Sequence, residues 1–155
     1  MKKGSNTFAL AYLMYAAPMS THTVVRSPED AYNVCKNSGD FAAEAFTVMC
    51  VNSKNQLIAG GIISIGIQDT CLCHPREVFR EAISRNAVAV ILVHNHPSGD
   101  PTPSAEDIRI TRQLVQAGQI VGIKVMDHII IGRPSPDRPR AFLSLRESGI
   151  VSFDT

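Results

Sequence analysis

One uninterrupted apolar run constrains the fold of this chain more than any other feature. Residues 88–93 read VAVILV, and His94, Asn95 and His96 follow directly. A short, continuous run of β-branched and aliphatic residues is typical of a strand that is covered on both faces. Together with the alternation of helix and strand patterns around it, the run predicts a layered α/β domain.

Helix and strand patterns alternate on either side of this run. Ser27 followed by Pro28 predicts a helix start, with the cap residue and the first-position proline in their preferred places. A turn at 53–55 between two β-branched segments indicates a hairpin. The expected helices cover 27–35, 74–87 and 104–117, and the expected strands cover 44–51, 56–67, a pair within 120–132, and 141–145. We expect a mixed β-sheet packed with helices.

Length and charge limit the classes of function. A chain of 155 residues has the size of one ordinary domain with a single core. Fifteen Lys and Arg against fourteen Asp and Glu give a formal net charge of +1. No stretch of the sequence holds the run of basic residues that a phosphate-binding face usually shows. We therefore expect no strong nucleic-acid binding by this chain.

The cysteines bear on the cellular compartment. Their spacing differs from that of a small secreted disulfide framework, because two lie in or beside expected strands and two form a close C-x-C pair. The four are Cys35, Cys50, Cys71 and Cys73. We expect reduced thiols in a cytoplasmic protein.

The N-terminal segment offers a competing reading. Lys2 and Lys3 precede ten apolar residues at 8–17, which resemble the core of a signal peptide. This stretch is too short to span a membrane, and Pro18 makes a poor cleavage site. We expect residues 1–26 to form an N-terminal extension that packs on the core, with no membrane association.

Two histidines at the end of the apolar run suggest a metal site. Side chains at i and i+2 of an extended strand project to the same side, so His94 and His96 can chelate one ion. A catalytic zinc takes three protein ligands, often His with a carboxylate, and keeps its fourth position for water. Asp107, at the start of the next expected helix, is the predicted third ligand. Ser104-x-x-Asp107 also reads as a capping box, and a rigid first turn is compatible with both roles.

These residues carry a family resemblance. H-x-H, seven residues and then S-x-x-D resembles the JAMM metalloprotease signature of JAB/MPN domains. HPREVFREAI at 74–83, HNHPSGDPTPSAED at 94–107 and DHIIIG at 127–132 resemble the C-terminal domain of bacterial RadC-type proteins, and the likeness runs from Ser27 to Gly149. It implies a JAB/MPN domain over 27–155, with layers like those of cytidine deaminases. No helix-hairpin-helix pattern fits ahead of it, so the chain resembles the stand-alone form.

The resemblance also implies an activity. JAMM domains are zinc-dependent hydrolases of amide bonds, which makes Zn²⁺ the expected cofactor and a peptide or protein conjugate the expected substrate. The metal ligands would be His94, His96 and Asp107, with Ser104 helping to hold the oxyanion. Glu44, which opens the first strong strand, matches the glutamate that acts as general base.

Other assignments stay open on the sequence. Glu77 and Glu81 are alternative bases, although they lie on the charged side of an amphipathic helix. The RadC likeness also admits a role in DNA repair or processing, or a metal-binding interaction module without catalysis. The oligomeric state, a homodimer included, stays open as well. Cys71-x-Cys73-His74 has no partner pair at zinc-finger spacing, so a second metal site there is disfavoured.

Two further segments have structural interpretations. His128 alternates with apolar neighbours, which is typical of a buried histidine with satisfied hydrogen bonds. Residues 132–140, with three prolines, are expected to form a flexible surface loop.

Overall fold

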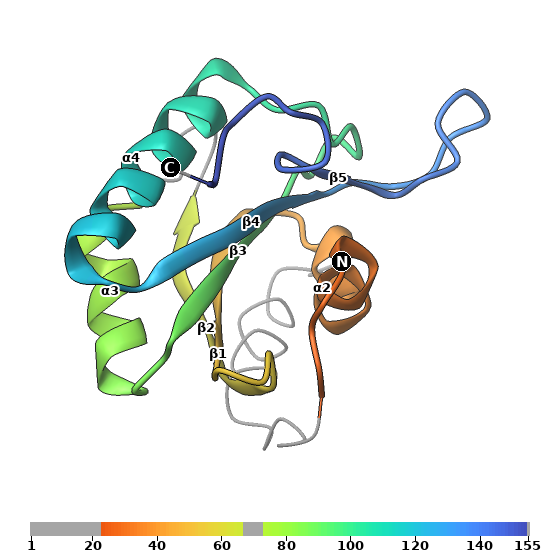
Figure 1. Cartoon of the computed structure of the whole chain (residues 1–155). Helices are drawn as coiled ribbons and strands as arrows, with labels where there is room; N and C mark the ends of the chain where they lie inside the picture. Colours follow the sequence, from red (N-terminus) through yellow and green to blue (C-terminus); the bar gives the residue numbers. More distant parts are fainter. Residues whose placement is uncertain (1–22, 67–72, 155) are drawn as a thin grey trace.

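The apolar run forms β3 (Ala89–Asn95), the middle strand of a five-stranded sheet with the order β2-β1-β3-β4-β5 (Figure 1). All of its residues are buried, which confirms the predicted strand covered on both faces. The computed structural model describes residues 23–66 and 73–154. The signal-peptide-like segment at 8–17 therefore lies outside the described residues.

The sheet is mixed, as expected. β1 (Glu44–Val51) runs antiparallel to both β2 (Leu57–Gly66) and β3. β4 (Lys124–Ile131) runs parallel to β3, and the short β5 (Phe142–Ser144) runs antiparallel to β4. Parallel neighbours need a crossover connection, which α4 (Ala105–Val121) supplies between β3 and β4.

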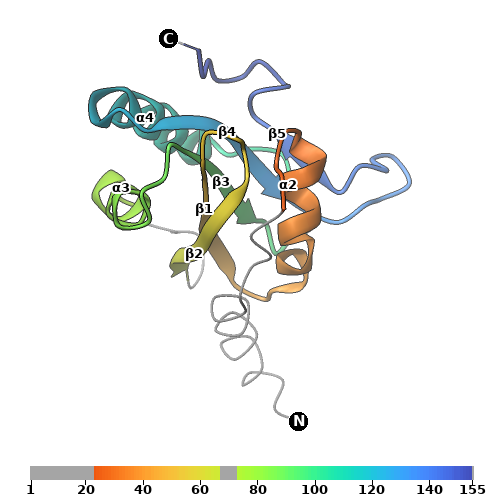
Figure 2. The same ribbon diagram turned by 60° about the horizontal axis from the view of Figure 1, so that its bottom comes forward.

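Helices cover both faces of this sheet. α2 (Pro28–Cys35) packs on one face, and α3 (Pro75–Ser84) packs beside α4 on the other (Figure 2). A short 3-10 helix, Lys36–Asp40, follows α2. Ser27 caps α2 by accepting a hydrogen bond from the Asp30 backbone, so the predicted helix start is confirmed.

Strand alternation directs polar side chains toward α4. Val90 and Leu92 of β3 belong to the core under α3 and α4, while the alternate residues Ala89, Ile91 and Val93 belong to the core under α2. His94 continues the first series and projects to the α4 face. On β1, Phe46 belongs to the same core, so Glu44 also lies on this face. Two neighbouring strands thus present polar side chains to one place.

The region 120–132 differs from the predicted strand pair, because it holds one strand and the end of a helix. α4 continues to Val121 and ends at Gly122, whose φ of 79° lies in the left-handed region that glycine adopts without steric cost. Ile120 and Val121 suggested a strand because they are apolar, but the two residues are 88% and 45% exposed on the last helical turn.

Cys35 and Cys50 are buried free thiols, as predicted, and Cys73 is also buried. Burial raises the pKa of the Cys35 thiol to about 12 and that of Cys50 to about 11. These thiols are therefore unreactive at neutral pH. Cys71 lies outside the described residues.

Two predictions concern membrane association and the N-terminal boundary of the domain. No helix within 23–66 and 73–154 is long and apolar enough to cross a membrane. The division of the chain at residue 26 and the cytoplasmic location stay predictions.

Candidate metal centre

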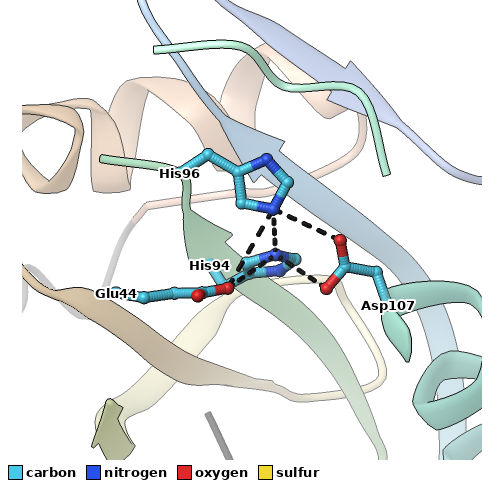
Figure 3. Close-up of side chains that lie close together, drawn as sticks. All are labelled: Glu44, His94, His96 and Asp107. Atoms are coloured by element: carbon cyan, nitrogen blue, oxygen red, sulfur yellow. Dashed lines mark hydrogen bonds and ion pairs between the residues drawn. The ribbon is translucent and has the colours of Figure 1, made fainter. Parts of the chain in front are cut away.

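Four side chains converge at the carboxyl end of β3 (Figure 3). The Nε2 atoms of His94 and His96 lie 2.9 Å apart. Asp107 Oδ1 lies 3.2 Å from Nε2 of His94, and its Oδ2 lies 3.2 Å from Nε2 of His96. Glu44 Oε1 lies 3.4 Å from the first nitrogen and 4.0 Å from the second. The structure thus brings the three predicted ligands together with the predicted base.

The cluster is open on one side. The side chain of His94 is 2% exposed, whereas those of His96 and Glu44 are 16% and 23% exposed. His94 therefore forms the floor of the site. The cluster is reached from the side of Glu44 and His96.

Asp107 combines the two roles that the sequence allowed. Its Oδ2 accepts a hydrogen bond from the Ser104 backbone at 2.7 Å, and its own backbone N–H donates to the Ser104 hydroxyl. Burial alone would raise the pKa of Asp107, but its contacts with the His94 and His96 rings and with the Ser104 backbone N–H outweigh burial and hold the pKa well below its usual range. The carboxylate is therefore ionised and held in place by the first turn of α4.

The loop after β3 sets the orientation of His96. Nδ1 of His96 lies 2.7 Å from the carbonyl oxygen of Asp100. Because a carbonyl only accepts, Nδ1 carries a proton and Nε2 faces the cluster. Burial opposes the charged ring, but the hydrogen bond and negative charge of Asp107 hold the pKa of His96 above its ordinary value.

Residues 132–140 form a surface loop that is tied to the loop carrying His96. The Arg133 guanidinium donates to the carbonyl of Pro97 at 2.9 Å, and Arg138 donates to the carbonyl of Gly99 at 3.0 Å. At Gly132 a Cβ atom would collide with that same Gly99 carbonyl, so only glycine allows this approach. The loop expected to be flexible therefore helps to support the site.

Asn95 connects the end of β3 to the start of β1. Its side chain is fully buried, and it hydrogen-bonds the backbone of Ala43 and Ala45, on either side of Glu44. Its contact with β1 depends on strand pairing, which the local sequence does not reveal.

His128 lies fully buried behind His94, on β4. Its Nε2 is 2.7 Å from Nδ1 of His94, and its Nδ1 is 2.5 Å from the hydroxyl of Thr111 on α4. Burial holds the pKa of His128 well below its ordinary value. The prediction of a buried histidine with satisfied hydrogen bonds is confirmed. No sequence signal indicated Thr111.

The donor set fits a divalent cation. Two imidazole nitrogens and two carboxylates, all of them acceptors when His96 is neutral, point at one another across distances under 5 Å. Such a group needs either a proton on His96 or a cation to balance its charge. Imidazole with carboxylate oxygen is a donor combination that zinc accepts. Among residues 23–66 and 73–154, no second group of this kind occurs.

The alternative candidates lie elsewhere. Glu77 sits in the first turn of α3 and accepts a hydrogen bond from the backbone of His74, while Glu81 pairs with Arg85. Neither belongs to the cluster. Of the disfavoured second metal site, Cys73 is buried, and Cys71 lies outside the described residues.

Ser104 is the exposed N-cap of α4. Its hydroxyl accepts the Asp107 backbone N–H at 3.1 Å, and it donates to no other described residue. The hydroxyl hydrogen therefore has no acceptor among the described residues. A role in holding an oxyanion stays a prediction.

Comparison with known proteins identifies the family of this chain. The sequence model of a family described as RadC-like JAB domain matches residues 25–150. This chain belongs to that family. A UPF0758 protein of Desulforamulus reducens is 47% identical over 137 residues, which cover 88% of this chain and 58% of the relative. The UPF0758 protein YsxA of Bacillus subtilis is 46% identical over 131 residues, or 84% of this chain and 54% of the relative.

This RadC-like JAB domain therefore spans only a little over half the length of these curated relatives. Their names state a family and no activity. The expected RadC likeness is confirmed. The stand-alone form stays a prediction.

Proposed function

We propose that this RadC-like JAB domain is a zinc-dependent hydrolase of the JAMM type, which cleaves an amide bond in a peptide or protein conjugate. The observation that carries the proposal is the convergence of His94, His96 and Asp107 on one point, with Glu44 beside them. Two imidazoles and one carboxylate form the ligand set of many hydrolytic zinc sites. Family membership supports the same conclusion.

The three proposed ligands would leave one coordination position of the ion open. His94, His96 and Asp107 would hold the ion and leave its fourth position to water or substrate. A bound zinc ion would lower the pKa of a water molecule and polarise the substrate carbonyl. The open side of the site, next to His96 and Glu44, would admit the scissile bond.

Glu44 suits the role of general base. Its Oε1 lies 3.4 and 4.0 Å from the two histidine Nε2 atoms, farther than the oxygens of Asp107 at 3.2 Å. A carboxylate beside the ion rather than on it can take a proton from the attacking water and pass it to the leaving nitrogen. The partial exposure of Glu44 lets it reach that water.

Ser104 would stabilise the oxyanion from the start of α4. Its hydroxyl hydrogen is available, and it lies three residues from the predicted ligand Asp107. Removal of one such donor costs about a hundredfold in rate in other hydrolases, so Ser104 should matter less than the ligands.

A substrate screen tests the proposal. The purified protein, either loaded with zinc or treated with a chelator, would be incubated with quenched fluorescent peptides and with isopeptide-linked ubiquitin-like conjugates. We expect amide hydrolysis that requires zinc. Hydrolysis that continues after metal removal would contradict the proposal, and zinc binding without any hydrolysis would favour the interaction module instead.

A further inference from the structure

A chain of hydrogen bonds runs behind the candidate metal centre. It starts at Nδ1 of His94, which lies 2.7 Å from Nε2 of His128. It continues from Nδ1 of His128 to the hydroxyl of Thr111 at 2.5 Å. It ends where that hydroxyl lies 2.5 Å from the backbone carbonyl of Asp107. These hydrogen bonds thus join two of the proposed ligands, His94 and Asp107, on the side away from the opening.

The direction of every hydrogen bond in this series follows from the last one, between the Thr111 hydroxyl and the Asp107 carbonyl. The Asp107 carbonyl can only accept, so the Thr111 hydroxyl must use its single hydrogen there. The hydroxyl then accepts from His128, whose Nδ1 carries the proton. A buried, neutral His128 offers a lone pair at Nε2, and Nδ1 of His94 donates to it.

We propose that His128 and Thr111 are positioning residues that hold His94 in its Nδ1–H tautomer, so that the Nε2 lone pair faces the cation. This inference rests on the proposed function for its consequence, metal binding, but not for the tautomer itself. The opposite direction along the chain would put a proton on Nε2 of His94. That proton would stand where the metal must bind.

The burial of His128 and Thr111 makes their hydrogen bonds hard to replace. Both His128 and Thr111 have no exposed surface, so water cannot replace a missing partner. His128 comes from β4 and Thr111 from the second turn of α4, so the chain also fixes α4 against the sheet. Removal of comparable outer partners of metal-bound histidines weakens metal affinity by about 10- to 100-fold.

Substitution of Thr111 separates this role from simple packing. Thr111→Val keeps the shape but removes the acceptor for His128, which frees His128 to carry its proton on Nε2 and so reverse the hydrogen bond to His94. Thr111→Ser retains the hydroxyl. Thr47→Val, on the α2 side of β1, is the matched control, because it makes the same change away from the cluster.

Two measurements test the proposal. Two-bond nitrogen–proton correlation NMR on metal-free protein, near pH 8, reports the tautomer of His94, whose signals are assigned with a His94→Gln variant. Zinc affinity is measured by competition with a chromophoric chelator. We expect the Nδ1–H form in wild type, zinc binding weakened about 10- to 100-fold by Thr111→Val, and near wild-type affinity in Thr111→Ser and Thr47→Val.

The outcomes distinguish this inference from the proposed function. An Nε2–H tautomer in metal-free wild type, or unchanged zinc affinity in a folded Thr111→Val variant, would overturn the positioning role. Wild-type protein with the Nδ1–H tautomer but no zinc affinity would overturn the proposed function while the tautomer assignment stands. If Thr111→Val does not fold, the wild-type spectrum still decides the tautomer.

Discussion

The side chain of Asn95 fixes the backbone on both sides of Glu44. Its Oδ1 accepts a hydrogen bond from the N–H of Ala45 at 2.8 Å, and its Nδ2 donates to the carbonyl of Ala43 at 3.0 Å. Asn95 stands between the two proposed histidine ligands in the sequence. One strand end therefore positions both ligands and the proposed base.

Asn95→Asp should destabilise the protein. The substitution keeps the acceptor for Ala45 but turns a carboxylate oxygen toward the Ala43 carbonyl, in a fully buried place. A buried acceptor left without its donor costs about 1–3 kcal/mol, so the free energy of unfolding should fall by at least that amount. Urea unfolding of the metal-free protein measures it.

Asn52→Asp is the control for this prediction. Asn52 donates to Gln56 in the partly exposed turn between β1 and β2, where water can take the place of a lost donor. We expect a much smaller change there. Equal effects of the two substitutions would show that Asn95 has no special part in joining β1 to β3.

Glu44→Gln should separate catalysis from metal binding. The substitution keeps the shape of the side chain and removes the base, while the three proposed ligands stay intact. Zinc content and melting temperature should stay near wild type, and amide hydrolysis should fall by about a hundredfold or more. Steady-state kinetics on a substrate from the screen provide the measurement.

Glu77→Gln and Glu81→Gln are matched controls, since both lie on α3 outside the cluster. Neither should lower the rate. If activity survives Glu44→Gln and disappears with one of these substitutions, the general base lies on α3 and not at Glu44. Loss of zinc in Glu44→Gln would instead make Glu44 a ligand.

The metal-free protein should lose stability as the pH rises above neutrality. Asp107 holds the pKa of folded His96 above its ordinary value of 6.5. The contribution of the charged His96 is therefore fully present below 6.5 and disappears as the pH rises through the raised pKa. Denaturant unfolding in the presence of chelator, between about pH 6 and about pH 8.5, should show this decrease.

His96→Gln provides the comparison for the pH series. The variant lacks the titrating ring, so its stability should depend less on pH over the same range. Identical pH profiles for wild type and His96→Gln would mean that the pair with Asp107 contributes nothing to the folded state.

DNA binding should be weak. The net charge is +1, and phosphate contacts by basic side chains supply most of the affinity of sequence-independent binding. We expect fluorescence anisotropy with labelled duplexes to detect binding only at low salt. Tight binding at physiological salt would contradict this prediction and would support the DNA-processing role that the RadC likeness admits.

Local sequence signals predicted most of the fold because each element here follows a local rule. The apolar run before His94 is a buried strand, and the capping pattern at Ser104 starts α4. The error at 120–132 arose because two exposed apolar residues at a helix end resemble a strand. Gly122, the left-handed cap, was the signal that separated helix from strand.

The candidate site was predictable only in part. Spacing along one segment indicated His94, His96 and Asp107, and the family resemblance supplied Glu44. The supporting residues Thr111 and His128 lack such a signal, because they meet only after α4 crosses over and β4 pairs beside β3. Contacts of this kind depend on tertiary structure and cannot be read from a local pattern.

Zinc content is the most direct test of the central claim. Elemental analysis of purified protein, with a chelator competition titration, would compare wild type, His94→Ala and Asp107→Ala, with His74→Ala as a histidine control outside the cluster. The account predicts about one zinc per chain in wild type and His74→Ala, and none in the two ligand variants. Equal zinc in all four proteins, or none in wild type, would contradict it.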